Sequence, residues 1–165
     1  MRESHAIFPG CFDPWTYAHQ SILERALRLF SKVTVAVLAD SEQKKIAFSA
    51  QTRQEIIIAS THKLENVSVE IFSGLVTEFC NKKNHFNVIR GVRRTEDFQY
   101  EWEMYHHNQV LCEQIEWVLL PCHKEYVGVS SSLVKEIHHY GGDISHWVPE
   151  SVIAALTKEP ETHGA

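Results

Sequence analysis

Short apolar runs separated by polar stretches recur along the chain, and they predict strands. Five such runs lie at residues 5–8, 33–39, 67–72, 87–90 and 115–120. The run VTVAVLA at residues 33–39 is continuous and β-branched between polar neighbours, which is typical of a strand that helices cover on both faces. The pattern therefore predicts a sheet that is buried on both sides.

Apolar residues at helical spacing fill the segments between these runs. They predict helices over residues 17–30, 75–84 and 97–111, and a further helix that Ser49 can cap. Another helix is expected to begin near Ser131 and to stop at Gly141-Gly142, and Pro149 is expected to open a short last helix. The alternation predicts an α/β fold with a doubly wound, five-stranded parallel sheet, Rossmann-like in arrangement. We expect one domain over residues 1–158 and a frayed tail at 159–165.

The stretch FPGCFDPWTYAH at residues 8–19 carries the strongest local signal. Pro9 and Gly10 are expected to end the first strand, and Thr16 can cap the helix that follows. In a parallel sheet such a junction lies at the carboxyl edge of a strand, where a helix N-terminus offers free N–H groups to anions. Because Thr16 and His19 are three residues apart, both can face that site.

Composition narrows the classes of protein to consider. The formal net charge of −5 argues against a general nucleic-acid binder. The longest apolar runs fall far short of the about 20 residues that a membrane-spanning helix needs, so we expect no membrane partner. The four cysteines show no C-x-x-C spacing, which favours reduced thiols in a cytoplasmic protein.

The loops that follow the predicted strands share one chemistry. They are rich in cations, small residues and hydroxyls, at Gly10 to His19, Lys44-Lys45, Gly74, Arg90 to Arg94 and Tyr126 to Ser132. These loops gather at one edge of a parallel sheet, so they predict a phosphate site there. The chain contains neither G-x-x-x-x-G-K-[ST] nor G-x-G-x-x-G, and it lacks H-E-x-x-H and G-x-S-x-G as well. The phosphates must therefore be held in another way.

The segment Thr16-Tyr17-Ala18-His19 resembles the (T/H)-x-G-H signature of a nucleotidyltransferase superfamily. The order of four blocks is similar to that of bacterial phosphopantetheine adenylyltransferases: FPGCFDPWTYAH, KK before Phe48, IRGVRRTEDFQYE, and VSSSLVKEI followed by GGDISHWVP. The resemblance covers about residues 6–156. It implies an enzyme of coenzyme A biosynthesis that transfers AMP from Mg-ATP to the phosphate of 4′-phosphopantetheine, giving dephospho-coenzyme A and pyrophosphate.

The resemblance also implies roles for individual residues. His19, Lys45 and Arg90 are the expected catalytic residues, with His19 on the α-phosphoryl group and the other two on the acceptor phosphate. The expected ATP-binding residues are Cys11, Phe12, His19, Gly91, Val92, Arg93, Glu101, Tyr126, Val127, Gly128, Val129, Ser130, Ser131 and Ser132. The expected residues around phosphopantetheine are Cys11, Lys45, Val76 and Arg90. We expect no protein ligand to the metal, because Mg²⁺ travels mainly with the ATP phosphates.

Partners follow from the same resemblance. It implies a homohexamer, and it implies dephospho-coenzyme A or coenzyme A as a product or feedback ligand in the same site.

Several other residues are better interpreted as structural. Trp102, Trp117 and Trp147 are expected in the core or at a subunit contact, and the pairs His106-His107 and His138-His139 are expected to be solvated or at an interface.

Two alternatives stay open from the sequence. Cys11, Ala18 and Ile46 stand where family members usually have Thr or Ser, Gly, and often Pro. A catalytically weakened paralogue that binds coenzyme A or a nucleotide is therefore one alternative. The other is a nucleotidyltransferase with a different phosphate acceptor, for instance nicotinate mononucleotide, or cytidylyl transfer to glycerol phosphate. The IRGxR and SSSLVKE blocks argue against a different acceptor.

Overall fold

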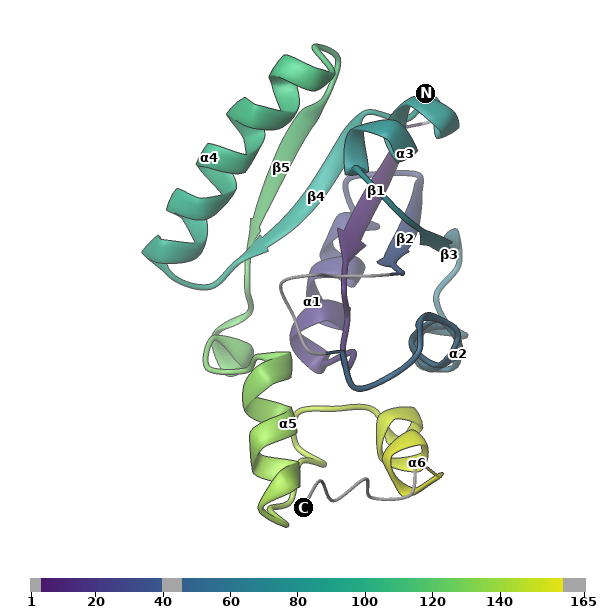
Figure 1. Cartoon of the computed structure of the whole chain (residues 1–165), viewed down its shortest axis with the longest axis vertical. Coiled ribbons are helices and arrows are strands. Elements are labelled where there is room, and N and C mark those ends of the chain that lie inside the picture. Colours follow the sequence, from purple (N-terminus) through teal and green to yellow (C-terminus); the bar gives the residue numbers. More distant parts are fainter. Residues whose placement is uncertain (1–3, 40–45, 159–165) are drawn as a thin grey trace.

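A five-stranded parallel sheet organises the part of the chain that the computed structural model describes, residues 4–39 and 46–158 (Figure 1). Its strands are β1 (His5–Gly10), β2 (Lys32–Leu38), β3 (Val67–Phe72), β4 (Asn87–Val92) and β5 (Glu116–Pro121). They lie in the order β3-β2-β1-β4-β5, and every neighbouring pair is parallel. The predicted α/β fold is confirmed.

Helices cover both faces of this sheet. They are α1 (Tyr17–Ala26), α2 (Ala50–Thr61), α3 (Val76–Lys83), α4 (Thr95–Leu111), α5 (Ser131–His139) and α6 (Glu150–Lys158), with a 3₁₀ turn at Lys124–Tyr126. Side chains of α1, α2, α5 and α6 share one buried cluster with Ala6 and Phe8 of β1. Ile7 points to the opposite face and belongs to a second cluster with α3 residues. The alternation along β1 thus separates two cores, as expected for a doubly wound sheet.

The first strand runs further than the sequence predicted. Pro9 and Gly10 do not end it, since they pair with Ala36 and Val37 of β2. On its other side, β1 pairs with β4 only at Ala6 and Ile7. The missing N–H of Pro9 therefore costs no bond to β4, and a proline is tolerated in a central strand.

The first helix ends earlier than predicted, at Ala26. Its last residues continue as a tighter turn, in which the N–H groups of Arg28 and Leu29 donate to the carbonyls of Arg25 and Ala26. Such i to i+3 bonds are typical of a helix C-terminus. The helical spacing of apolar residues continues into this turn, which explains why the pattern overestimated the helix.

The tryptophans that the sequence assigned to structural roles differ in exposure. Trp117 and Trp147 pack against the two buried clusters, whereas Trp102 on α4 is 53% exposed. The predicted loop with Lys44 and Lys45 and the predicted tail at residues 159–165 lie outside the described residues. No helix among the described residues is long and apolar enough to cross a membrane.

Candidate active site

A cavity of about 440 Å³ opens at the carboxyl ends of β1 and β4. The N-termini of α1 and α5 and the first turns of α4 complete its wall. It therefore lies at the edge of the sheet where a doubly wound fold binds its ligands. Predicted site residues that line it are Cys11, Phe12, His19, Arg90, Gly91, Arg93, Glu101, Val129, Ser130, Ser131 and Ser132.

The loop between β1 and α1 is shaped by Phe12, whose φ of 51° lies in the left-handed region. This backbone folds the phenyl ring back over Gly10, so closely that a Cβ on Gly10 would lie 2.8 Å from the ring. The ring also packs edge-on against Trp15 and His19, with centroids 5.1 Å from each. Glycine at position 10 is needed because no side chain fits beneath the ring.

His19 is held by the helix that carries it. Its Nδ1 accepts the backbone N–H of Thr16 at 3.1 Å, and its own N–H donates to Thr16 Oγ1 at 3.4 Å. The two residues thus form a reciprocal cap at the start of α1, and the cap predicted at Thr16 is confirmed. Since Nδ1 accepts a backbone hydrogen, the neutral ring carries its proton on Nε2. His19 lines the cavity, and the cap leaves Nε2 as the ring nitrogen that can donate a hydrogen bond.

Asp13 connects the loop between β1 and α1, residues 11–16 and called the opening loop below, to two distant segments. Its carboxylate accepts the N–H groups of Ala47 and Phe48, each at 2.9 Å, and it pairs with Lys135 Nζ of α5 at 2.6 Å. The Asp13 residue is only 5% exposed, so these bonds form in a partly desolvated setting. The residues immediately after the predicted Lys44-Lys45 loop are therefore held against the cavity.

Arg53 of α2 lies beneath the same loop and is completely buried. Its Nε donates to the carbonyl of Phe48 at 3.0 Å. Its Nη groups donate to the carbonyls of Cys11, Leu38 and Ala39 at 2.6–3.0 Å. One guanidinium thereby joins the loop between β1 and α1, the end of β2 and the segment that leads into α2. All of its bonds given by the structure are to backbone carbonyls, so its charge is solvated by peptide dipoles.

Arg90 in the second half of β4 is paired with Glu101 of α4. Its Nε and Nη2 donate to the two carboxylate oxygens at 2.8 and 2.7 Å, and its Nη1 donates to the carbonyl of Pro9 at 2.8 Å. Trp117 Nε1 donates to the same carboxylate at 2.9 Å. The geometry is bidentate, which fixes the plane of the guanidinium at the cavity wall.

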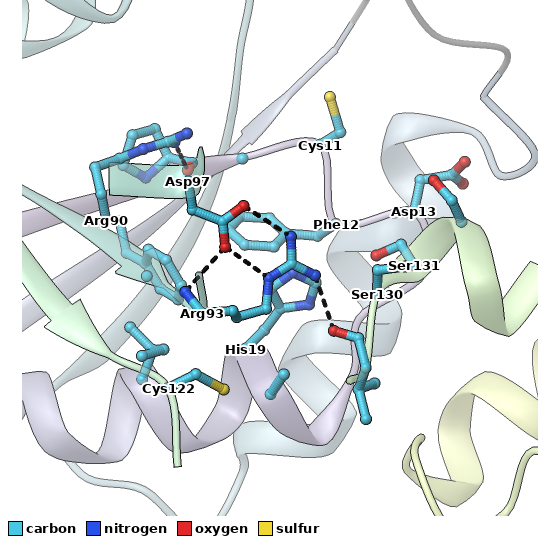
Figure 2. A pocket seen from close by; sticks show the side chains of 18 of the residues that line it. Cys11, Phe12, Asp13, His19, Arg90, Arg93, Asp97, Cys122, Ser130 and Ser131 are labelled. Carbon is cyan, nitrogen blue, oxygen red and sulfur yellow. Dashed lines mark hydrogen bonds and ion pairs between the residues drawn. The ribbon is translucent and has the colours of Figure 1, made fainter. Parts of the chain in front are cut away.

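Arg93 makes a similar pair with Asp97, which lies on α4 one helical turn before Glu101. Its Nε and Nη2 donate to the carboxylate at 3.1 and 3.4 Å, and its Nη1 donates to the carbonyl of Val129 at 3.0 Å. Burial would raise the pKa of Asp97, but the hydrogen bonds and charge of Arg93 outweigh it and lower that pKa below its ordinary value. Figure 2 shows Arg90 at the left of the view, Asp13, Ser130 and Ser131 at the right, and the Arg93–Asp97 pair between them.

The serine run lies at the N-terminus of α5. Ser130 accepts the N–H of Leu133 at 3.1 Å and so caps the helix, while Ser131 Oγ donates to the carbonyl of Pro14 at 2.8 Å. Both side chains border the cavity together with Ser132. The serines therefore present a capped helix N-terminus, with its partial positive charge, toward any ligand in the cavity.

Two cysteines line opposite parts of the cavity. The sulfur atoms of Cys11 and Cys122 lie on different sides of the view in Figure 2, and both thiols are free. Burial raises the pKa of the Cys122 thiol. Ala18 is a buried residue in the first turn of α1, where its methyl group suits the helix better than glycine would.

Some predicted residues do not border the cavity. Val76, Val92, Tyr126, Val127 and Gly128 are absent from its lining, and Lys45 lies outside the described residues. Their assignment to ligands stays a prediction. Conversely, Asp13, Asp97 and Lys135 line the cavity without having been predicted. Only Asp97 had a signal in the sequence, because it stands four residues after Arg93, a spacing that suits an ion pair on a helix.

Metal-binding side chains do not cluster in the described ranges 4–39 and 46–158. No group of three or more His, Cys, Asp or Glu side chains there is arranged to hold a metal ion. Of the carboxylates that line the cavity, Asp13, Asp97 and Glu101 each pair with a lysine or an arginine.

Comparison with known proteins agrees with this architecture. The family model described as cytidylyltransferase-like matches residues 7–137. A phosphopantetheine adenylyltransferase of Thermosynechococcus vestitus is 45% identical over 151 residues, which cover 92% of this chain and 89% of that protein. The phosphopantetheine adenylyltransferases of Synechocystis sp. and Heliobacterium modesticaldum are 42% and 38% identical, and the matches cover 92% and 93% of this chain and 94% and 91% of those proteins. Because these matches extend over almost the whole chain, it belongs to the cytidylyltransferase-like family and, within that family, to the phosphopantetheine adenylyltransferases.

Proposed function

We propose that this enzyme transfers the adenylyl group of ATP to the phosphate of 4′-phosphopantetheine, in coenzyme A biosynthesis. The observation that carries the proposal is the placement of His19, Arg90, Arg93 and the serine run around one cavity. A histidine donor, two arginines and two helix N-termini suit a ligand with several phosphates. The reaction forms a bond from an acceptor phosphate oxygen to the α-phosphorus and breaks the bond to the β-phosphate, so pyrophosphate leaves with the electron pair.

The acceptor needs little activation by the protein. A phosphate monoester has its second pKa near about 6, so at neutral pH it is already a competent nucleophile. Catalysis can therefore rest on positioning and on stabilising the charge that develops at the α-phosphoryl group. The Nε2–H of His19 suits the stabilisation of that charge, because the hydrogen bond from the Thr16 N–H to Nδ1 holds the ring in one tautomer and orientation.

Arg90 is proposed to bind the acceptor phosphate together with Lys45. The bidentate bond to Glu101 and the bond to Pro9 place the Arg90 guanidinium beside the opening loop. Cys11 in that loop is proposed to lie near the same phosphate. A backbone N–H can serve an acceptor oxygen there even though a thiol is a weak donor. Val76 is proposed to line the rest of the phosphopantetheine.

The ATP side is proposed to lie between the end of β4 and the start of α5. Arg93 and the serines, with Gly91 and Phe12, border the cavity there. We propose that Mg²⁺ enters with the ATP phosphates, where it would neutralise phosphate charge. The cationic partners of Asp13, Asp97 and Glu101 support this route over an all-protein metal site, as does the reluctance of Mg²⁺ to shed its waters.

We also propose that the enzyme works as a homohexamer in the cytoplasm and that dephospho-coenzyme A or coenzyme A binds the same site. Support for self-association comes from α4, which exposes several large apolar side chains: Phe98, Tyr100, Trp102, Val110 and Leu111. Free cysteines support a reducing compartment.

The decisive experiment incubates the purified protein with Mg²⁺, ATP and 4′-phosphopantetheine. Pyrophosphate release with formation of dephospho-coenzyme A, identified by mass, is the expected result. Parallel reactions replace the acceptor with nicotinate mononucleotide, or the pair with CTP and glycerol phosphate. Turnover of one of these alone would assign a different acceptor, and ligand binding without turnover would assign a binding module.

A further inference from the structure

Two carboxylates on one face of α4 hold the two arginines of the cavity. Asp97 and Glu101 are four residues apart, so they lie one helical turn apart on the same side of the helix. Asp97 pairs with Arg93 and Glu101 pairs with Arg90. Glu101 is one of two buried residues among the mostly exposed positions of α4. Burying a carboxylate is costly unless its partner is fixed, so this face is built around the arginines.

The two pairs share one hydrogen-bonding pattern. In each arginine, Nε and Nη2 donate to the carboxylate, and Nη1 donates to a backbone carbonyl of another segment, which is β1 for Arg90 and the loop before α5 for Arg93. Among the described residues these bonds use three of the five N–H groups of each guanidinium. The other two N–H groups of each guanidinium take no part in these bonds, so they can donate to a phosphate.

The two backbone carbonyls differ in the part of the cavity that they belong to. Arg90 donates to Pro9 of β1, two residues before Cys11 in the loop that follows the strand. Arg93 donates to Val129, which precedes the serine run at the start of α5. The carboxylates thus hold one arginine against the opening loop and the other against the α5 N-terminus.

We propose that Glu101 and Asp97 are positioning residues, and that they serve different substrates. Glu101 acts through Arg90 on the acceptor phosphate, and Asp97 acts through Arg93 on ATP. The inference rests on the proposed function, because it takes from it which substrate each arginine binds. It reassigns Glu101, which the sequence placed among direct nucleotide contacts, to the acceptor side. The depressed pKa of Asp97 agrees with a carboxylate that stays ionised beside its arginine.

The test measures steady-state kinetics of Glu101→Gln and Asp97→Asn with each substrate varied in turn. Both changes keep the side-chain shape and remove the charge. We expect Glu101→Gln to raise the KM for 4′-phosphopantetheine about tenfold or more, and Asp97→Asn to raise the KM for ATP by a similar factor, each with a much smaller effect on the other substrate. Glu103→Gln is the matched control, because Glu103 is an exposed residue of α4 outside the cavity lining.

A double-mutant cycle separates positioning from a general structural role. If Glu101 acts through Arg90, Glu101→Gln should change the acceptor KM little in an Arg90→Ala background. Equal effects in both backgrounds, an ATP-specific effect of Glu101→Gln, or unchanged KM values in the single variants would overturn the inference. Inactivity of the unmutated enzyme would instead reject the proposed function, so the two failures are distinguishable.

Discussion

The Nδ1 atom of His19 accepts the backbone N–H of Thr16 at 3.1 Å, so the residue proposed to contact the α-phosphoryl group also closes the cap of its own helix. Thr16 returns the contact by accepting the N–H of His19 on its hydroxyl. This reciprocal cap determines which ring nitrogen carries the hydrogen. It also means that a change at position 19 can affect stability and catalysis for separate reasons.

His19→Ala and His19→Gln should separate these two effects. Alanine removes the acceptor for the Thr16 N–H, so the free energy of unfolding should fall by about 0.5–2 kcal/mol. Glutamine at this position can complete a capping box, so stability should be retained. Both variants lose the imidazole donor, and turnover should fall by about 10²–10³ in each. Urea unfolding and pyrophosphate release measure the two quantities. Turnover that follows stability would contradict the proposed role of His19.

Sequence reasoning identified the junctions of this fold because their chemistry is local. Thr16 and Ser49 cap the helices they were predicted to cap, since an N-cap depends on residues within one turn. The predicted end of β1 was wrong, because Pro9 was expected to break the strand. Whether a proline disturbs a strand depends on which neighbour would have bonded its N–H, and that is set by the sheet register.

The candidate site was predictable where it depends on motifs and not where it depends on the backbone. His19, Arg90, Arg93 and the serine run stand in recognisable blocks, and the fold brings them to one cavity. Arg53 had no signal, because its partners are backbone carbonyls and every residue type has one. An arginine in a helix otherwise looks like a surface residue.

Arg53→Met should strongly destabilise the enzyme. The change leaves the carbonyls of Cys11, Leu38, Ala39 and Phe48 without their donor in a buried setting. We expect a loss of about 3–5 kcal/mol in the free energy of unfolding, which urea denaturation measures. Arg28→Met is the control, because Arg28 is exposed and should change stability by less than about 0.5 kcal/mol. Equal effects of the two substitutions would show that the buried network contributes little.

Trp102→Glu tests whether α4 forms the subunit contact. Trp102 is 53% exposed and stacks on Phe98, with ring centroids 6.1 Å apart, so a charge there should disrupt an apolar interface. Light scattering after gel filtration should give a hexamer mass for the unmutated protein and a smaller mass for the variant. Tyr140→Glu places the same charge on an aromatic position that is 80% exposed, away from α4, and should leave the mass unchanged. A hexamer that tolerates Trp102→Glu would place the interface elsewhere.

His5 lies at the start of β1, at the opposite end of the strand from the cavity, and its surroundings disfavour the imidazolium form. The ring is half-buried, Nε2 lies 2.8 Å from Thr34 Oγ1, and the His85 ring lies 3.8 Å away, centroid to centroid. Burial, followed by the charge of His85, lowers the pKa of His5 to about 4. Further charged groups that act on it are Lys32, Glu70 and Lys83.

This depressed pKa predicts a loss of stability in mild acid. Below the ordinary value of 6.5 the unfolded chain takes up a proton at His5, whereas the folded protein resists protonation until about pH 4. The contribution of His5 is therefore fully present above pH 6.5 and is lost as the pH falls from 6.5 toward 4. Free energies of unfolding at half-unit pH intervals should decline less steeply over this range in His5→Gln than in the unmutated protein. His138→Gln, at an exposed position of α5, should keep the original slope, and an unchanged slope in His5→Gln would reject the assignment.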